Sequence, residues 1–540
     1  MRLRILVCIN AIVLFTALAI PAGVSAQEQQ QQEPGIQRPE QRADAPHHWY
    51  RVVDIGTLLQ PLRRWVSRRS GIGSNTNFGG PDSYFTFGVG LTNRGEAAGA
   101  AATSSPDPFS PVCIFPDCFV GHAFLWRDGV ASDLGALPGT NNSGVSGMNA
   151  HGTVIGVSEY GLVDPVINFP DLEPIVWKNG RIIDLGTFGG NFGQANAIND
   201  RGQVVGFATN TIPTPVSIAA FGCDVDLAVP TQSRAFIWEG GAIQDLGTLG
   251  GSDSCAVFIN ERGQVAGYSF TDSSASPPVH PFLWHDGTML DLGTLGGTFA
   301  LTFALNNQGE VAGLSFLAGD SVFHPFLWHR GQLSDLGTLG GETGNAESLN
   351  DAADVVGEAD LPSPSGSQVH HAFLWRHGVM TDLGTQDGDP CSLALSINSR
   401  GQVVGASTDC STVRHAFLWE QGGPMVDLNS FVAASSNLTL TVATLINDRG
   451  EIATQGVLPN GDTHAILLIP CSEGDEGCGD DAESRTVAPQ SNAPAVTRSS
   501  TDLIRGNPPR NSRPSAMLDR LRARLTDRYN VPGHATGPAN

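Results

Sequence analysis

Eighteen residues decide how this chain folds: HPFLWHDGTMLDLGTLGG, at positions 280–297. Nearly the same stretch recurs as HPFLWHRGQLSDLGTLGG at 324–341 and as HAFLWRHGVMTDLGTQDG at 371–388. Each time, an apolar run ending in Trp is followed by a short polar turn and then by Asp-Leu-Gly. Internal repetition of this kind indicates a protein built from stacked copies of one supersecondary unit.

The tryptophans of the apolar run give the repeat length. Successive tryptophans lie 44 to 61 residues apart, at Trp126, Trp177, Trp238, Trp284, Trp328, Trp375 and Trp419. A period in the mid-forties suits a four-stranded propeller blade, although helical repeats reach the same length. Each unit contains four short apolar or β-branched runs separated by turn residues, and no helical stripe, so the sequence predicts β-strands.

The runs also predict how the chain closes. Complete sets of four runs begin at His122, Pro174, Arg234, His280, His324, His371 and His415. Three further runs precede them, in YRVVDIGTL and FGVGLTNRGEAAGAA, and a lone first run, HAILLIP, follows at 464–470. Pairing these ends would complete a blade and leave no exposed sheet edge. We therefore predict an all-β fold, a β-propeller of eight four-stranded blades over residues 47–470. Seven blades, or an open solenoid, are the alternatives.

The turn between the third and fourth runs is repeated as well, as NAHG, NDRG, NERG, NNQG and NSRG. Asn can close an Asx turn on its own backbone, and Gly can adopt the left-handed conformation that returns the chain. The turn lacks the alternating oxygen ligands of a calcium loop, so we interpret it as structural. Ala353 occupies the Gly position in NDAADVVG, and we expect that turn to be built differently.

The two ends of the chain read differently from the repeats. Residues 1–26 combine Arg2 and Arg4 with a short apolar run and a small-residue site, which predicts a signal peptide cleaved after Ala26. Residues 27–46 are rich in Gln and Pro and are expected to be a disordered leader. Residues 471–540 read as a disordered acidic and Pro-rich tail, with a short amphipathic helix near 515–528.

Charge and cysteine content narrow the location and the partners. The chain has 53 acidic and 30 basic residues, which argues against duplex nucleic acid or an anionic membrane as a partner. No second long apolar stretch follows the first, so we expect no membrane insertion after signal removal. An even number of mature cysteines suits disulfides in an extracellular or periplasmic compartment. The candidates are Cys113, Cys118, Cys223, Cys255, Cys391, Cys410, Cys471 and Cys478.

The unit HAFLW…DLGTLGG…INDRGQVVG resembles the HAF-repeat family of probable extracellular bacterial repeat proteins. The resemblance recurs in every unit and covers about four-fifths of the chain. It implies an exported, propeller-like protein whose biochemical role is not defined by the family, so no catalytic residue is carried over. The sequence departs from the pattern where Pro174 and Arg234 replace the His and where DLG becomes DLN at Asp427.

A His, a Trp and an Asp recur together, and we interpret them as a structural network that locks each blade. A residue repeated in nearly every unit is scaffold rather than site. If His begins the innermost strand, a ring of imidazoles that binds zinc or copper is the alternative. The network comprises His122, Trp126, Asp133, His280, Trp284, Asp291, His324, Trp328, Asp335, His371, Trp375, Asp382, His415, Trp419, Asp427 and His464, with Asp54, Asp184 and Asp245 in the same Asp series.

Function should lie where the units differ. One face of the propeller should carry only short, near-identical turns, and the other every long insertion, at 58–86, 104–121, 157–173 and 208–233. Cysteines fall on this second face, where the pairs Cys223–Cys255 and Cys391–Cys410 are sterically possible, while Cys113–Cys118 and Cys471–Cys478 would close small local loops. These bridges would hold the long loops in place.

We find no catalytic, cofactor or metal motif. The leading hypothesis is therefore a secreted binding module whose long-loop face engages an extracellular protein, a glycan or a cell-envelope polymer. A polysaccharide lyase or glycoside hydrolase is the alternative, with unrepeated carboxylates such as Asp387, Asp389 and Glu342 as candidates. A structural surface or matrix component is a third hypothesis, because fold alone does not choose among them.

Overall fold

The chain is built almost entirely from β-strands. The computed structural model describes residues 50–56, 86–110, 119–165, 169–214, 231–274, 276–362, 369–386, 388–432, 437–461 and 463–471. Within these ranges there are 32 strands and one 3-10 helix, η2 (Leu428–Phe431). No helix in these ranges is long and apolar enough to cross a membrane.

Several sequence predictions lie outside the described residues. They concern the signal peptide with its cleavage after Ala26, the leader, residues 472–540 of the tail with its helix near 515–528, and the side chains of Cys113, Cys118, Cys223, Cys478 and Asp387.

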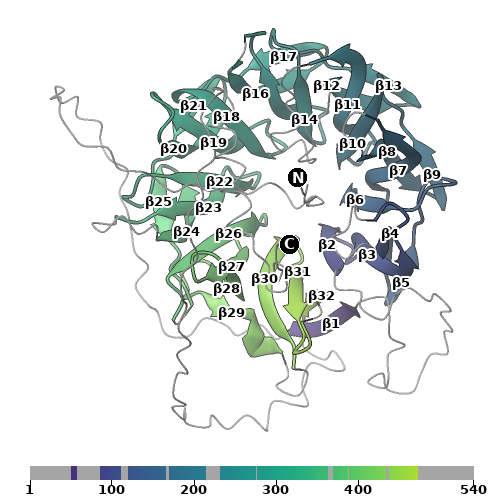
Figure 1. Ribbon diagram of the computed structural model, residues 1–540. Coiled ribbons are helices and arrows are strands. Elements are labelled where there is room, and N and C mark those ends of the chain that lie inside the picture. The colour runs from purple at the N-terminus through teal and green to yellow at the C-terminus, as the bar shows by residue number, and fades with distance from the viewer. Residues whose placement is uncertain are drawn as a thin grey trace, which may run out of the picture.

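The strands form a β-propeller, with four-stranded antiparallel blades set around a ring (Figure 1). The innermost strands are β2 (Thr86–Leu91), β6 (Ser143–Met148), β10 (Gly189–Ile198), β14 (Ser254–Ile259), β18 (Gly296–Leu305), β22 (Gly344–Leu349), β26 (Cys391–Ile397) and β30 (Thr439–Ile446). The second strands are β3 (Ala97–Pro106), β7 (Val154–Asp164), β11 (Val204–Pro213), β15 (Val265–Phe270), β19 (Val311–Leu317), β23 (Val355–Asp360), β27 (Val403–Thr408) and β31 (Ile452–Val457).

The HAFLW-type runs form the third strand of each blade, and the runs ending in Asp-Leu-Gly form the outermost strand. The third strands are β4 (Phe119–Arg127), β8 (Phe169–Lys178), β12 (Thr231–Glu239), β16 (Val279–His285), β20 (Phe323–His329), β24 (His370–Arg376), β28 (Val413–Trp419) and β32 (Thr463–Pro470). The outer strands are β5 (Val130–Asp133), β9 (Arg181–Asp184), β13 (Ala242–Asp245), β17 (Thr288–Asp291), β21 (Gln332–Asp335), β25 (Val379–Asp382), β29 (Val426–Asp427) and β1 (Tyr50–Gly56).

This strand order corrects the repeat boundaries. The sequence analysis began each unit at the HAFLW run and took that run as the innermost strand. Instead, β15 pairs with β16 through Val265↔Trp284 and Ser269↔His280, so the run lies third from the centre. Each blade is one sheet made of two antiparallel hairpins. The segment after Asp-Leu-Gly leads to the next blade. A central ring of imidazoles requires the repeated histidines to begin the innermost strands. They lie on the third strands instead, so this requirement is not met.

The pairing of the terminal segments is observed, with the contributions reversed. β1 pairs antiparallel with β32 through Tyr50↔Pro470 and Asp54↔Ile466, side by side in Figure 1. The C-terminal part of the chain supplies β30, β31 and β32, and the N-terminal part supplies only the outer strand. The sequence analysis assigned three runs to the N-terminal end because it placed the unit boundary half a blade away.

The apolar core lies between neighbouring blades. The third strands are buried on both sides, as the pattern BiBBBBe in β16 records, because each sheet is packed between two others. Phe282 and Trp284 of β16 pack with Val205, Ala235 and Leu246 of the preceding blade. Trp284 lies four residues beyond His280 on the same strand. The tryptophans therefore fill inter-blade space near the opposite end of the strand from the histidines, and do not form a compact triad with His and Asp.

The two faces of the ring carry different connections. The short-turn face carries the turns from innermost to second strands, such as 260–264, and from third to outer strands, such as 286–287. The long-loop face carries the connections from second to third strands and from each outer strand to the next innermost strand. Because neighbouring strands run in opposite directions, these two sets of connections must lie on opposite faces.

The repeated asparagines link the blades on the short-turn face. Each Asn side chain donates from Nδ2 to the backbone oxygen of the equivalent residue in the next blade. These hydrogen bonds are 2.8–3.2 Å long and join Asn149 to Asn199, Asn199 to Asn260, Asn260 to Asn306, Asn306 to Asn350, Asn350 to Asn398, Asn398 to Asn447 and Asn447 to Thr92. Thr92 has no side-chain amide, so the series of side-chain donors ends there. We call this series the asparagine ring.

The turn around each asparagine has the expected Asx geometry. The N–H of Thr153 donates to Asn149 Oδ1 at 3.0 Å, and that of Gly152 donates to the Asn149 carbonyl at 3.0 Å. The expectation for Ala353 was wrong. Ala353 adopts a φ of 61° and donates its N–H to the Asn350 carbonyl at 3.1 Å, so the turn keeps the same form with an alanine in the left-handed region.

Candidate functional site

The repeated His and Asp side chains meet on the long-loop face of most blades. Nδ1 of the His lies 2.8–3.0 Å from a carboxylate oxygen in the pairs His122–Asp133, His280–Asp291, His324–Asp335, His371–Asp382 and His464–Asp54. The Asp also accepts the N–H of the Gly two residues on, at 2.8 Å between Gly293 and Asp291. Each pair therefore fastens the start of a third strand to the end of the outer strand.

These pairs are electrostatically matched. Burial alone would lower the pKa of His122, but the hydrogen bond and the charge of Asp133 raise it. Arg234 replaces the His in the β10–β13 blade and still supplies a cation, with Nε 3.0 Å from Asp245 Oδ2. A basic side chain therefore recurs at this position together with the Asp, which is typical of residues with a structural role.

In the β26–β29 blade, the repeated His and Asp have different hydrogen-bond partners. His415 Nδ1 lies 2.7 Å from Oδ2 of Asp389, which is buried in the connection before β26. Asp427 instead caps η2 by accepting the N–H of Asn429 at 2.8 Å. The change from DLG to DLN therefore removes Asp427 from the His–Asp network into which the sequence analysis placed it.

One blade carries an acid where the others carry a cation. Counting back four residues from Trp177, as from Trp284 to His280, leads to Glu173. The sequence analysis placed Pro174 at this position because it aligned the start of the apolar run instead of its tryptophan. The strand register gives the same equivalence: Glu173 lies opposite Ser158, as His280 lies opposite Ser269. Glu173 therefore stands beside the repeated Asp184 with no cation between them.

Four acids gather around this position: Asp164, Asp171, Glu173 and Asp184, which we call the carboxyl cluster. Burial, together with the negative charges of Asp184 and Asp171, raises the pKa of Glu173 to about 8. Burial and the charge of Asp164 raise the pKa of Asp171 to about 6. Asp171 is only 7% exposed, and its Oδ1 has no hydrogen-bond partner; nor does Oε2 of Glu173. A buried carboxyl oxygen without a donor is costly, so these two oxygens of Asp171 and Glu173 would be stabilised by a cationic or donor group.

Three acids of the carboxyl cluster, Asp164, Asp171 and Glu173, lie on a long hairpin. β7 has 11 residues and β8 has 10, against 6 in β15 and 7 in β16. Two other hairpins are nearly as long, with 10 and 9 residues in β3 and β4 and in β11 and β12. The extension falls within the predicted long insertion 157–173 and pairs through Val163↔Pro170 and Asp164↔Phe169. Asn191 of β10 donates to Asp164 Oδ2 at 2.9 Å, which ties the hairpin to the next blade. We call this extension the β7–β8 hairpin.

Exposed apolar side chains occupy the same hairpin. Immediately before Asp164, the side chains of Tyr160, Leu162 and Val163 are 49%, 59% and 40% exposed. Only three other large apolar residues are as exposed in the part of the chain that the structure describes: Val130, Ile212 and Leu290. Large exposed apolar side chains gathered beside charged groups are typical of an interaction surface.

The described disulfide is the one predicted from the face assignment. Cys391, at the start of β26, is bonded to Cys410 in the β27–β28 connection, with Cα atoms 5.0 Å apart. Cys255 and Cys471 are also disulfide-bonded, while their predicted partners, Cys223 and Cys478, lie outside the described residues. The bridge joins the connection before β26 to the β27–β28 connection, which confirms that the two kinds of connection on the long-loop face meet. The β27–β28 connection, which contains Cys410, links two strands of the same blade.

The carboxylates proposed for an enzyme are not gathered. Asp389 is engaged with His415, and Glu342 is exposed in the connection before β22. These two residues precede the innermost strands of different blades. Among the described residues, no group of three or more His, Cys, Asp or Glu side chains is arranged to hold a metal. The site with the most unusual chemistry, the carboxyl cluster, was missed by the sequence analysis.

Comparison with known proteins finds similar solved structures at low sequence identity. No family model and no curated protein matches it, so membership of the HAF-repeat family stays a prediction. The chain is similar to the β-propeller domain of the trilobed protease from Pyrococcus furiosus, with 9% identity, a TM-score of 0.38, and coverage of 65% of this chain and 99% of that one. It is also similar to acylaminoacyl peptidase from Pyrococcus horikoshii, with 10% identity, a TM-score of 0.37, and coverage of 70% and 58%.

A glycosidase also appears among the similar structures. The GH93 α-L-arabinofuranosidase of Fusarium graminearum has 9% identity and a TM-score of 0.28, over 74% of this chain and 96% of that one. At such identities a shared propeller carries no information on activity. Function must therefore be argued from the residues of this chain.

Proposed function

We propose that this chain is an extracellular binding module whose long-loop face captures a cationic segment of a protein partner at the β7–β8 hairpin. The observation that carries the proposal is the replacement of the repeated His or Arg by Glu173, beside which buried oxygens of Asp171 and Glu173 have no hydrogen-bond partner. The other described His or Arg positions of the repeat place a positive or neutral donor against an acid. A partner that supplies the missing cation would complete the same arrangement in trans.

The chemistry of the hairpin favours a lysine or arginine flanked by apolar side chains. A guanidinium or ammonium group would satisfy the buried oxygens of Asp171 and Glu173 by charge-assisted hydrogen bonds. Tyr160 and Leu162 would cover the apolar part of the same segment. Apolar anchors beside a desolvated charge pair are the usual composition of a binding hot spot.

Binding should depend on pH in a way that general attraction to an acidic protein does not. Glu173 and Asp171 hold protons up to pKa values of about 8 and about 6. A bound cation favours their ionised forms, so binding releases protons and tightens as pH rises from 5 to 8. Ordinary surface carboxylates are fully ionised over that range and give no such dependence.

The test uses the full chain and two acetylated, amidated tripeptides, Leu-Arg-Leu and Leu-citrulline-Leu, titrated calorimetrically at pH 5 and pH 8. We expect the arginine peptide alone to bind, with higher affinity at pH 8. Glu173→His should weaken binding at pH 8 about tenfold, as expected for losing a charged hydrogen bond, and reduce the pH dependence to the part that Asp171 contributes. The matched control is Asp286→Asn, an exposed acid in a short turn where φ is 49°, which Asn tolerates.

Equal weakening by Asp286→Asn and Glu173→His would show that only net charge attracts the peptide, and would overturn the proposal. Binding of the citrulline peptide as tightly as the arginine peptide would overturn it as well.

One observation favours a second function, hydrolysis of a glycan. Glu173 is held protonated beside Asp184, and a protonated carboxyl beside a second carboxyl is the arrangement that glycosidases use. Asp184 Oδ1 already accepts the N–H of Gly186 at 2.8 Å, as its counterparts do in ordinary blades, which favours a structural role for it. Incubating the full chain and Glu173→Gln with polysaccharides decides the matter. Products formed by the parent chain and lost in the variant would replace binding by catalysis.

A further inference from the structure

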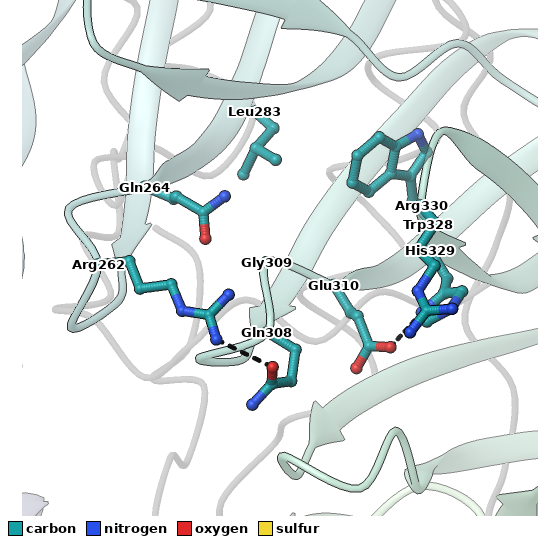
Figure 2. Close-up of a pocket in the computed structure, with 9 residues that line it drawn as sticks. All are labelled: Arg262, Gln264, Leu283, Gln308, Gly309, Glu310, Trp328, His329 and Arg330. Carbon is teal, nitrogen blue, oxygen red and sulfur yellow. Dashed lines mark hydrogen bonds and ion pairs between the residues drawn. The ribbon is translucent and has the colours of Figure 1, made fainter.

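A pocket opens on the short-turn face, where the sequence analysis expected only plain turns. It has a volume of about 380 Å³ and lies between the β14–β17 and β18–β21 blades (Figure 2). Its polar wall comes from Arg262, Gln264 and Gln308, and its apolar wall from Leu283 and Trp328. This volume is at the small end of ligand pockets and suits a single ring with its substituents.

The pocket lies at a junction where the residue after the repeated Trp is a histidine. At two other blade junctions, the arginine that follows the repeated Trp lies against the turn glycine of the next blade. A Cβ on Gly401 would come 2.8 Å from Arg376 Nη2, and one on Gly152 would meet Arg127 Nη2 as its nearest atom. The equivalent residue here is His285, whose Nδ1 instead lies 3.5 Å from Oδ2 of its neighbour Asp286. The neighbour of Gly309 is the Gln264 amide, whose Oε1 would lie 2.7 Å from a Cβ there, and this amide forms part of the pocket wall.

The charges around the pocket leave a positive excess. Glu310 is buried, and its Oε1 is hydrogen-bonded to Nδ1 of His329. Arg262 donates from Nη2 to the neutral amide of Gln308 at 3.0 Å, a contact visible in Figure 2. Among the described residues, neither Arg262 nor Arg330 forms an ion pair with a carboxylate. In a chain with a formal net charge of −23, this is a place where an anion meets unmatched arginines.

Shape and charge together select one class of ligand. The Trp328 indole offers a flat apolar surface. The amides of Gln264 and Gln308 supply donors and acceptors for hydroxyl groups, and Arg262 can hold a carboxylate with two parallel hydrogen bonds. We propose that this inter-blade pocket binds one acidic sugar residue, a uronic acid, independently of the carboxyl cluster on the opposite face.

The experiment titrates the full chain with glucuronate and with glucose, followed by ligand-observed NMR and by calorimetry. Glucuronate should bind saturably, and glucose about tenfold more weakly, because the carboxylate supplies a charged hydrogen bond. Arg262→Gln should weaken glucuronate binding by a similar factor. Arg201→Gln, at the equivalent turn position of the preceding blade, changes the charge by the same amount and should leave affinity within about twofold.

A second variant separates the pocket from its charge. His285→Arg should place a guanidinium against Gly309, as Arg376 lies against Gly401, displace the Gln264 amide from the pocket wall, and so weaken binding even though the variant adds a positive charge. Stronger binding by His285→Arg, equal weakening by Arg201→Gln and Arg262→Gln, equal affinity for glucose and glucuronate, or no saturation with glucuronate would each overturn the proposal. Glu173→His should leave glucuronate binding unchanged, so this proposal and the proposed function fail separately.

Discussion

The β14–β17 and β6–β9 blades share their strand register and differ at one decisive position. In both, the outer Asp lies opposite the residue two before the tryptophan, as Phe282↔Asp291 and Ile175↔Asp184. In both, a buried serine of the second strand accepts a backbone N–H at 3.0 Å. Only the partner of the Asp changes, from His280 to Glu173. The comparison teaches that a repeated network is scaffold and that its single like-charge exception is the place to look for function.

The exchange reverses the direction of the pKa shift. Burial would raise the pKa of Asp291, but the hydrogen bonds from His280 and from the Gly293 N–H lower it. Burial and the negative charge of Asp184 both raise the pKa of Glu173, to about 8. The same backbone thus holds an ion pair in one blade and a protonated acid in the other.

The largest effect on stability is expected when the like-charge pair is introduced into a blade that has the repeated His–Asp pair. His280→Glu removes the hydrogen bond to Asp291 and places a second carboxyl beside it. We expect the free energy of unfolding at pH 8 to fall by about 2–4 kcal/mol. The loss should be smaller at pH 5, where the introduced acid is protonated and can donate to Asp291. Denaturant unfolding at the two pH values measures both, and an equal loss at pH 5 and 8 would contradict the like-charge explanation.

The reverse substitution should stabilise the exceptional blade. Because the folded state raises the pKa of Glu173 to about 8, its cost is absent below the unfolded pKa near 4.3 and grows as pH rises toward 8. Glu173→His should therefore raise the melting temperature by about 2–4 °C at pH 8 and change it little near pH 4.5. A variant equally stabilised at both pH values would show that packing, rather than ionisation, is responsible.

A smaller effect is expected from Asp184→Asn. The amide oxygen can keep the hydrogen bond from the Gly186 N–H, now 2.8 Å long, while the negative charge beside Glu173 disappears. The pKa of Glu173 should fall by on the order of one unit, measured by carbon-13 NMR titration of the side-chain carboxyl. An unchanged pKa would mean that burial alone holds the proton.

The smallest effect should follow Asp171→Asn. Asp171 contributes less than Asp184 to the raised pKa of Glu173, so the same titration should move in the same direction by less. A shift larger than that of Asp184→Asn would place Asp171 at the centre of the cluster and would alter which carboxyl a bound cation contacts first.

The sequence was sufficient for the propeller fold, for the pairing of the chain ends and for the Cys391–Cys410 bridge. These depend on period, on alternating strand direction and on which face a connection occupies. The predicted blade boundaries were half a unit away from the observed ones. The repeat does not reveal which runs pair within one sheet, such as the strands that carry Ser269 and His280. Any of four starting points gives the same period.

The candidate site was only partly predictable. The insertion at 157–173 was identified as a variable region, and its long hairpin carries the exposed side chains. Glu173 was missed although counting back from Trp177 locates it, since the apolar run was aligned by its first residue. The pocket beside Gly309 was beyond prediction because it depends on the directions taken by side chains of two blades, among them Gln264 and Trp328.

Joining Asp54 to His464 across 410 positions of sequence has a consequence for how the molecule is made. β1 emerges from the ribosome first, yet it cannot find its partner until β32 has been synthesised. Until then, the growing chain presents an unpaired strand edge, the kind of surface on which chaperones act and from which aggregates grow. A nascent chain that stops before residue 463 would lack β32 and could not close, and quality control would meet an open array instead of a finished ring.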